Sequence, residues 1–347
     1  MRILCPIIGG SGVEVYHQRL AKGLVRNGIE MQIVRLSSRF EYLPWLLNWK
    51  SRWMPSLNLE PDLLHTNAEY GCYFKKRPIP WVVTLHHCSI DDQYDTFVSL
   101  GARLHHRLFL RPSTIRSLTA ADCVVAVSEH TRMTVNQALQ RECPMRVIYN
   151  GIDPEIYSPP EYHSAVKKGP VVLFFSGNPT FRKGFDLLAP VMQRLGGDFE
   201  LRFSAGLRNS HPDRNLPRNM RCLGTLTEQE LVQEIKRADI VLQPSRREGF
   251  GYSILEGMAC GKPIISSNCS SIPELVQHGK GGYLCDVGSV EQIVKAIQDL
   301  GQSIEKRTIM GEYNRQQVLK RFTLQQMTEQ YVALYQDSLG NYERHRD

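Results

Sequence analysis

Near its C-terminal end the chain reads Arg247-Glu248-Gly249-Phe250-Gly251-Tyr252-Ser253-Ile254-Leu255-Glu256-Gly257-Met258-Ala259-Cys260-Gly261-Lys262-Pro263-Ile264-Ile265. This pattern predicts a loop, a helix that is opened by glycines, and a strand. A buried strand is expected just before it, at residues 241–244, and stops at its proline. The helix is expected to start near Tyr252 and to end at Gly261, because glycine readily adopts the left-handed conformation that terminates helices.

The residue types in this stretch suit a ligand that carries a phosphate and several hydroxyl groups. Gly249 and Gly251 have no side chains to block the backbone amides at the helix start, and such a terminus favours anions. Glu248 lies just outside the helix, and Glu256 lies about one turn inside it, with a side chain that leans back toward the start. Ionised carboxylates only accept hydrogen bonds, so they suit hydroxyl donors such as a ribose or a sugar ring. The stretch indicates a nucleotide-sugar site; the alternative is a surface loop and a helix with two solvated glutamates.

Length and composition describe a globular chain of two domains. At 347 residues the chain is too long for one ordinary core, and 42% hydrophobic with 22% charged residues are globular values. No apolar run is long enough to span a membrane, and the N-terminal run is expected to be a first strand and not a signal peptide. The nine cysteines are scattered without a Cys-x-x-Cys pair, which favours reduced thiols in a cytosolic protein over a disulfide frame or a zinc site.

The positive charge is concentrated in the first half of the chain. Residues 1–150 hold 18 Lys+Arg against 12 Asp+Glu, a balance of +6, and the net charge of the whole chain is +7. A modest basic surface fits anionic lipid or phosphate-bearing ligands. No recognisable nucleic-acid-binding module accompanies the charge, so nucleic acid is not an expected partner.

The first half alternates strands with helices around a glycine loop. Ile3–Ile8 is expected to be a strand, Gly9-Gly10-Ser11-Gly12 a turn, and the following helix is expected to run to about Asn27. This order suits a doubly wound nucleotide-binding domain, although the glycine spacing is not that of a dinucleotide fingerprint. Further strands are expected at 31–36, 63–65, 81–86, 123–128 and 146–149, with a helix at 129–140 that Ser128 caps.

The second half begins again after a turn-rich segment from Asn150 to Gly169, where we expect the domain boundary. Strands are expected at 171–175, 201–204, 221–223, 264–266 and 282–285. Thr227 and Glu230 form a capping box that opens a helix, a short helix covers 272–278, and helices follow from Ser289 to the end. Alternation in both halves predicts two α/β domains with largely parallel sheets.

Several motifs together resemble the retaining glycosyltransferases of family 4 (glycosyl transferase group 1). They occur in the family's order over nearly the whole chain: Glu248 and Glu256 as Glu-x7-Glu, Gly9-Gly10-Ser11-Gly12, Val127-Ser128-Glu129, Asn150-Gly151-Ile152-Asp153, Lys183-Gly184 and Ile272-Pro273-Glu274-Leu275. The resemblance implies the GT-B fold, with two facing Rossmann-like domains, parallel sheets and an interdomain cleft. Residues 1–150 would form the acceptor-side domain, against which a C-terminal helix at about 323–338 packs, and residues 151–322 the nucleotide-sugar-binding domain.

The resemblance also implies roles for individual residues. Glu256 would bind the ribose, Glu248 the transferred sugar, and Lys183 the donor diphosphate. The remaining donor-binding positions would be Gly10, Gly12, Asn178, Gly249, Phe250, Gly251 and Tyr252.

Two of the implied site residues have open alternatives. His86 matches a histidine that contacts the donor sugar, but His87 beside it leaves the register open, and the alternative is a core or loop histidine. Many members have an arginine where this chain has Asn178, and Arg182 would provide the second positive charge; the alternative for Arg182 is a solvated surface charge.

The expected reaction is transfer of a hexose from a UDP- or GDP-sugar to a hydroxyl acceptor. Breaking the anomeric bond develops negative charge on the leaving phosphate, which positioned cations and helix amides stabilise. No Asp-x-Asp motif occurs in the sequence, so we expect a metal-independent enzyme without a cofactor; the family implies retention of configuration. No residue is marked as a nucleophile; sugar positioning is the expected role of Glu248, and the alternative is that Glu248 acts as the nucleophile. A sugar-nucleotide epimerase or hydrolase and an inactive GT-B scaffold subunit are the alternatives, and an oxidoreductase is disfavoured because the fingerprint is missing.

Two basic segments of the first half suggest where the acceptor binds. Residues 39–54 mix three tryptophans with basic side chains, and Arg103, Arg107, Arg111 and Arg116 follow one another with no acid between them. Aromatic and basic residues suit a membrane interface. We therefore expect a glycan or lipid-linked acceptor, cell-surface polysaccharide or glycolipid synthesis, and a cytoplasmic protein peripheral to the inner face of the cell membrane. The alternative is a surface loop and an ordinary charged helix.

Overall fold

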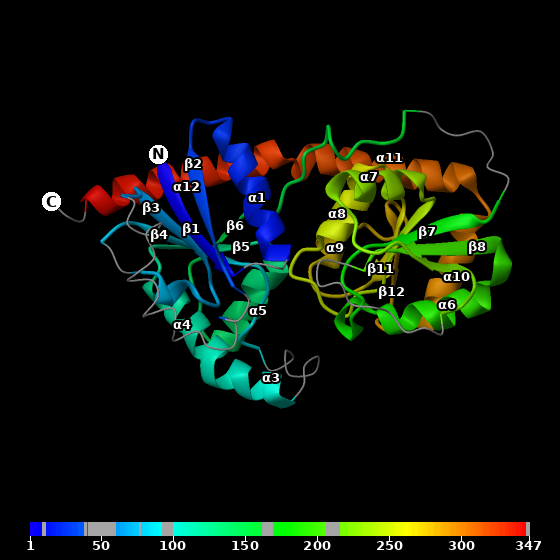
Figure 1. Cartoon of the computed structure of the whole chain (residues 1–347), viewed down its shortest axis with the longest axis horizontal. Helices are drawn as coiled ribbons and strands as arrows, with labels where there is room; N and C mark the ends of the chain where they lie inside the picture. Colours follow the sequence, from blue (N-terminus) through cyan, green and yellow to red (C-terminus); the bar gives the residue numbers. More distant parts are fainter. Residues whose placement is uncertain are drawn as a thin grey trace. The chain divides into compact units, whose positions relative to one another are not determined.

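The computed structural model describes residues 1–8, 12–37, 40, 60–75, 78–91, 100–161, 169–205 and 216–344. The chain forms two compact units (Figure 1). Unit 1 consists of Met1–Gly151 together with Leu324–Asp347, and unit 2 is the continuous segment Ile152–Thr323.

Unit 1 is built on a six-stranded parallel sheet. Its strands lie in the order β2 (Glu30–Leu36), β1 (Arg2–Ile8), β3 (Leu63–Asn67), β4 (Trp81–Leu85), β5 (Cys123–Ala126) and β6 (Arg146–Val147). β3 and β4 are buried along their whole length, as expected for central strands of a parallel sheet that is covered on both faces.

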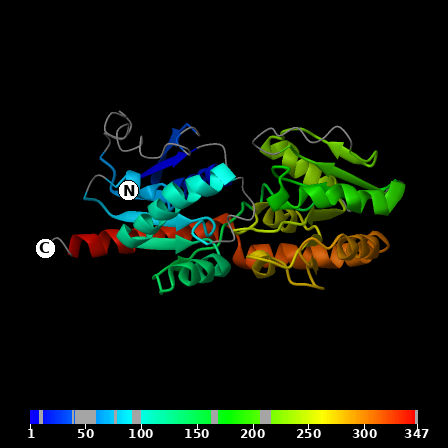
Figure 2. The same ribbon diagram turned by 90° about the horizontal axis from the view of Figure 1, so that it is seen from below.

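The helices of unit 1 are α1 (Gly12–Val25), α3 (Leu100–His105), a π-helical turn (His106–Leu110), α4 (Arg111–Ala120), α5 (Glu129–Leu139) and α12 (Leu324–Arg344). Figure 2 draws α12 in red beside the strands of unit 1. Helix α12 packs closely on α1, because a Cβ atom at Gly23 would lie 2.2 Å from the Thr328 hydroxyl oxygen. The last helix of the chain is therefore part of the core of the first unit.

Unit 2 repeats the architecture with a second six-stranded parallel sheet. The strand order is β12 (Gly282–Cys285), β11 (Ile264–Ser267), β10 (Ile240–Gln243), β7 (Val171–Phe175), β8 (Phe199–Phe203) and β9 (Met220–Cys222). The helices are α6 (Leu188–Leu195), α7 (Glu228–Arg237), α8 (Tyr252–Ala259), α9 (Ile272–Leu275), α10 (Val290–Gly301) and α11 (Ile304–Arg321).

The predicted fold class is confirmed, and so are several predicted helix ends. Ser128 caps α5 by accepting from the Thr131 amide, and Thr227 and Glu230 form the predicted capping box. Helix α8 starts at Tyr252 as predicted, and Gly261 just beyond it has a φ of +67°.

Other predicted ends differ from the structure. The strand predicted at 123–128 ends at Ala126, and Ser128 is the N-cap of the next helix. The helix predicted to reach Gln140 ends one residue earlier, because Gln140 adopts the left-handed conformation of a cap. The strand predicted at 146–149 has only two residues, the strand predicted at 81–86 stops at Leu85, and the helix predicted at 272–278 stops at Leu275. The last helix runs to Arg344, beyond the expected end near residue 338.

No helix within the described ranges is both long enough and apolar enough to cross a membrane.

Candidate active site

Two cations and one carboxylate meet in unit 2. Lys183 Nζ lies 2.5 Å from Glu248 Oε1, and Arg182 lies 3.7 Å from the other carboxylate oxygen. Ser245 donates a third contact to Glu248, with its hydroxyl 2.8 Å from Oε1. The carboxylate of Glu248 is 9% exposed and Lys183 is 15% exposed, whereas Arg182 is open to solvent at 44%.

The surroundings of Glu248 keep its carboxylate ionised. Burial alone would raise the pKa of Glu248, but the charges of Lys183 and Arg182 and the hydrogen bonds from Lys183 and Ser245 outweigh burial, and the pKa is lowered. At neutral pH the cluster therefore has a buried acceptor-only carboxylate with two cations beside it.

A tight turn positions Lys183. It ends the short 3-10 helix η6 (Phe181–Lys183), which Thr180 caps, and Gly184 follows with a φ of +71°. A Cβ atom at Gly184 would lie 2.0 Å from the carbonyl oxygen of Pro244. Only glycine fits there, so the turn that holds Lys183 contacts the backbone at the end of β10 directly.

Arg246 fastens the two loops of the cluster together. Its guanidinium forms a bidentate ion pair with Asp186, at 2.7 and 2.8 Å, and donates to the carbonyl oxygen of Phe181 at 2.6 Å. The same guanidinium stacks 3.8 Å from the centre of the Phe181 ring. In the opposite direction, the Arg182 guanidinium donates to the carbonyl oxygen of Arg247 at 2.9 Å. The loop of Lys183 and the loop of Glu248 are thus held as one rigid element.

The residues that follow Glu248 form the start of α8. Gly251 is the N-cap, with a φ of +107°, and Phe250 is buried, with its ring near those of Tyr252 and Phe322. From the loop after β11, the Ser271 hydroxyl donates to the carbonyl oxygens of Phe250, at 3.1 Å, and Glu248, at 3.4 Å. This second loop therefore also fixes the backbone that carries Glu248.

The other predicted donor-binding residues of unit 2 lie on the same loops and helix. Glu256 is buried at 6% exposure within α8, and Asn178 is half-buried in the loop after β7. The end of β7 is tied to this region because the carbonyl oxygen of Ser176 accepts from Gln243 at 2.8 Å and from Ser253 at 3.1 Å. The carboxyl end of the sheet and the start of α8 thus share one hydrogen-bond network.

In unit 1, His86 follows the end of β4 in a buried aromatic cluster. Its ring lies 4.5 Å from that of Tyr16 and 5.6 Å from that of His17, and its Nε2 is buried without a hydrogen-bond partner in the described part of the chain. Burial lowers the pKa of His86 well below its usual value, and the neighbouring histidines His17, His87 and His65 lower it further. His86 is therefore neutral at physiological pH.

A buried polar network, which we call the tyrosine–histidine network, lies beneath His86. Tyr335 contacts His65 at 2.8 Å, His65 contacts Thr84 at 2.7 Å, Thr84 contacts Tyr331 at 3.1 Å, and Tyr331 contacts Tyr16. Both Tyr331 and Tyr335 come from α12, so the network joins the last helix to the sheet. Sequence reasoning did not find it, because its members are up to 315 positions apart and carry no local motif.

Some of the predicted residues cannot be placed. Gly10 lies outside the described residues, as does most of the segment 39–54, whereas Gly12 is the exposed first residue of α1.

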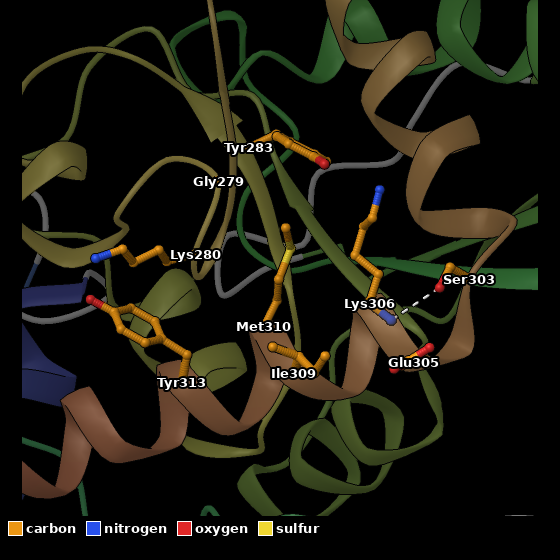
Figure 3. Close-up of a pocket in the computed structure, with 9 residues that line it drawn as sticks. All are labelled: Gly279, Lys280, Tyr283, Ser303, Glu305, Lys306, Ile309, Met310 and Tyr313. Atoms are coloured by element: carbon orange, nitrogen blue, oxygen red, sulfur yellow. Dashed lines mark hydrogen bonds between the residues drawn. The ribbon is translucent and has the colours of Figure 1, made fainter.

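A pocket of about 560 Å³ on unit 2 is lined by residues of 279–283 and 303–313 and includes none of the predicted site residues (Figure 3). There the polar groups of Lys306 and Tyr283 are already engaged by Asp299, at 2.8 and 2.6 Å.

Known protein families match both halves of the chain. Residues 10–156 match the model of Glycosyltransferase Family 4, and residues 162–317 match that of the Glycosyl transferases group 1. The chain belongs to this family of glycosyltransferases.

Individual relatives are distant in sequence. An uncharacterized glycosyltransferase of Methanocaldococcus jannaschii is 26% identical over 287 residues, which cover 80% of this chain and 75% of that protein. N-acetyl-alpha-D-glucosaminyl L-malate synthase of Bacillus anthracis is 37% identical over 115 residues, 33% of this chain and 30% of that protein.

Solved structures define the fold. Sucrose-phosphate synthase from Thermosynechococcus elongatus matches 98% of this chain and 100% of its own, with a TM-score of 0.82 at 18% identity. HepE of Anabaena in complex with UDP and glucose matches 96% of this chain and 99% of its own, with a TM-score of 0.76 at 20% identity. The fold is GT-B, as the sequence predicted.

Proposed function

We propose that this glycosyltransferase moves a hexose from a nucleoside-diphosphate sugar to a hydroxyl group, with retention of anomeric configuration. The observation that carries the proposal is the cluster of Lys183, Arg182 and Glu248, in which two cations and an ionised carboxylate lie next to the glycine-opened start of α8. Retention of configuration follows from the family pattern.

The cations have the chemistry that the leaving group needs. Lys183 and Arg182 bind the diphosphate and neutralise the charge that grows on it as the anomeric bond breaks, and the amides of Gly249, Phe250 and Gly251 add to this. No metal ion has a part in this scheme, so transfer is expected to continue in a chelator. Glu248 accepts from hydroxyl groups of the transferred sugar when diphosphate replaces it as the partner of Lys183.

The remaining site residues surround the nucleoside and the sugar. Glu256 accepts from the ribose hydroxyl groups, with Tyr252 and Asn178 beside the donor, and Gly10 and Gly12 of the Gly9-Gly10-Ser11-Gly12 motif are further proposed donor-binding residues. His86 contacts the transferred sugar as a neutral imidazole, for which its buried position and lowered pKa are the support.

UDP-sugars are the first donors to test, because HepE of Anabaena, which has a similar fold, was solved in complex with UDP and glucose, and GDP-sugars are the second. In a thermal-shift screen, the matching nucleoside diphosphate and its sugar are expected to raise the melting temperature, since a ligand that binds only the folded state stabilises it. Transfer to a hydroxyl acceptor with release of the diphosphate would then separate a transferase from a hydrolase or an epimerase. No shift with any nucleotide, and no turnover, would contradict the proposal.

We further propose a cytoplasmic protein that attaches to the inner face of the membrane, where it builds a cell-surface glycan or glycolipid on a lipid-linked acceptor. The support is the helical segment 100–120, which contains no acidic residue. Leu100, Leu104 and Leu108 are spaced four residues apart there and are 79%, 60% and 57% exposed. Arg107 and Arg116 are exposed on the same segment, so leucines and cations meet as on membrane-surface helices.

Vesicle flotation tests this attachment. Vesicles with equal parts of phosphatidylcholine and phosphatidylglycerol are expected to bind the protein at low salt, and binding is expected to weaken with salt. Replacement of Leu104 and Leu108 by serine should release it, whereas the equally exposed Met133, replaced by serine, serves as the matched control. Absence of binding at low salt, or equal loss in the control, would end this part of the proposal.

A further inference from the structure

Polar side chains at or just beyond the carboxyl ends of β3 and β4 have atoms with no hydrogen-bond partner among the described residues. β3 and β4 are parallel neighbours, and Asn67 at the end of β3 pairs in register with Thr84. Asn67 Oδ1, Glu69 Oε1 and His86 Nε2 are buried and have no hydrogen-bond partner in the part of the chain that the structure describes. Asn67 and Glu69 are each only 8% exposed.

Deeper positions of the same two strands show the opposite pattern. Residues two apart on a strand point to the same face, so His65 and Asn67 form one row and Thr84 and His86 the next. His65 is bonded on both ring nitrogens, to Thr84 at 2.7 Å and to Tyr335 at 2.8 Å. The inner members of both rows are thus satisfied, and the unused atoms belong to the outer members at the edge of the sheet.

Unused buried polar atoms are rare in folded proteins, because a buried donor or acceptor without a partner destabilises the folded state. In open α/β sheets the carboxyl edge of the strands is also where ligands bind. Three such atoms, on the last residue of β3, on the turn that follows it and on the residue after β4, therefore indicate partners that a bound molecule supplies.

The turn that carries Glu69 is held firmly in place. The Ala68 amide donates to the carbonyl oxygen of Thr84 at 3.1 Å, and the Ser113 hydroxyl donates to the carbonyl oxygen of Glu69 at 2.6 Å. Burial raises the pKa of the Glu69 carboxyl to about 7, which a hydrogen bond from its own backbone only partly offsets. The Glu69 carboxyl group is therefore held in position before any ligand binds. Its raised pKa shows that burial of the ionised form is unfavourable.

We propose that Asn67 and Glu69, together with His86, form a binding subsite for the hydroxyl groups of a neutral sugar. The Asn67 amide oxygen accepts hydrogen bonds, and the Glu69 carboxyl group and the His86 imidazole nitrogen each accept or donate according to where the proton lies, so together they match sugar hydroxyl groups, which also do both. This inference rests on the proposed function for its context, since both the donor and the acceptor of that reaction carry such hydroxyl groups.

Shape-conserving apolar variants test the subsite. Glu69→Met and Asn67→Leu remove the unused polar atoms, so they are expected to raise the melting temperature and to raise the KM for the bound sugar about tenfold or more. The control is Thr66→Val, because the Thr66 hydroxyl accepts from the Trp81 indole at 2.9 Å. Loss of that satisfied bond should lower the melting temperature and leave both KM values unchanged.

The two sources of the sugar are separated by the substrate whose KM changes. A higher KM for the acceptor assigns the subsite to the acceptor, and a higher KM for the donor, measured as hydrolysis without acceptor, assigns it to the transferred sugar. Lower melting temperatures with unchanged KM values would overturn the proposal.

A wild-type protein that transfers no sugar would refute the proposed function alone. The subsite is then tested by the thermal shift that free glucose, galactose or mannose gives with the wild type and with Glu69→Met. A shift in the wild type that the variant lacks would uphold it, and equal shifts or none would overturn it.

Discussion

The two units accommodate buried ionisable side chains in opposite charge states. In unit 2 the Glu248 carboxylate is kept charged by Lys183 and Arg182, whereas in unit 1 His65 and His86 are kept neutral by burial. A charged cluster can exchange one of its members for an anionic ligand, because the remaining charges still find partners. A neutral network instead offers fixed hydrogen-bonding directions. The difference fits diphosphate chemistry in unit 2 and scaffolding and sugar contacts in unit 1.

The largest expected effect comes from breaking the charged cluster. Lys183→Ala and Glu248→Ala are each expected to lower kcat by at least about 10²–10³-fold, the usual scale for removing a group that stabilises transition-state charge. Both variants should remain folded, since the cluster lies at the rim of the sheet. Steady-state transfer assays with circular dichroism measure both properties. The matched control is Lys306→Ala, which breaks an ion pair with Asp299 in the same unit. Near-normal turnover of either cluster variant would refute the assignment.

The next largest effect is expected on stability, and it compares an alanine substitution at Gly184, in the turn that holds Lys183, with one at Gly28, in a turn of unit 1. Gly184→Ala must adopt a φ of +71° and also pushes its Cβ against the carbonyl oxygen of Pro244. Gly28→Ala meets a similar φ of +68° but has open space around it. The Gly28 variant should cost about 1–2 kcal/mol of unfolding free energy, the usual penalty of the left-handed conformation, and the Gly184 variant clearly more. Equal costs in chemical denaturation would show that the contact with Pro244 is unimportant.

A smaller effect is the loss of folding stability in acid that is expected from the buried neutral histidines of unit 1. Burial lowers the pKa of His17 to about 4 and that of His65 and His86 well below 6.5, so the folded state binds fewer protons than the unfolded state. The stability that these histidines provide is complete above pH 6.5 and is lost as the pH falls toward 4, by up to about 1.4 kcal/mol per pH unit for each group.

Glu69 has the opposite sign. Its raised pKa of about 7 gives stability that is complete below pH 4.5 and is lost as the pH rises toward 7. Removing it with Glu69→Gln should therefore steepen the fall of unfolding free energy between pH 7 and pH 4.5, again by up to about 1.4 kcal/mol per pH unit. Denaturation at several pH values measures the slopes, and identical slopes for wild type and variant would contradict the assignment.

The smallest expected effect comes from deleting one hydroxyl in each unit. Tyr331→Phe removes a member of the tyrosine–histidine network and should cost about 1 kcal/mol of stability, with the donor KM unchanged. Ser271→Ala removes the contact that fixes the backbone of Glu248, and it should cost a similar amount but also lower kcat/KM for the donor severalfold. Rescue of kcat/KM by Ser271→Thr would separate loss of the hydroxyl from a general loosening, and unchanged kinetics in Ser271→Ala would show that the loop is not a positioning element.

Local chemistry made much of the fold predictable from the sequence. Capping residues such as Ser128 and Thr227, and the terminator Gly261, act on backbone groups within a few positions, so their patterns are visible in a single chain. The roles of Lys183 and Glu248 came from a family resemblance and stay predictions, whereas the direct contact between these two side chains was not predicted.

Contacts between distant segments were not predictable. The bidentate pair of Arg246 with Asp186 depends on the close approach of Gly184 to Pro244, a tertiary feature without a local signal. Asn67 and Glu69 are likewise ordinary polar residues in the sequence. They become candidates only because Asn67 Oδ1 and Glu69 Oε1 are buried without a hydrogen-bond partner in the part of the chain that the structure describes.

The path of the chain through unit 1 has a consequence for how the protein is made. The first part of unit 1 ends at Gly151, and the rest of it, from Leu324 onward, is synthesised only after the whole of unit 2. Until then the Thr84 hydroxyl lacks its hydrogen-bond partner Tyr331, and the His65 ring lacks its partner Tyr335. At that stage all strands of unit 2 have already been synthesised. Domains fold as units during translation, and here the segment that begins first is the one that finishes last. A chain that is truncated after residue 323 would contain the whole of unit 2 joined to a unit 1 that lacks its last helix.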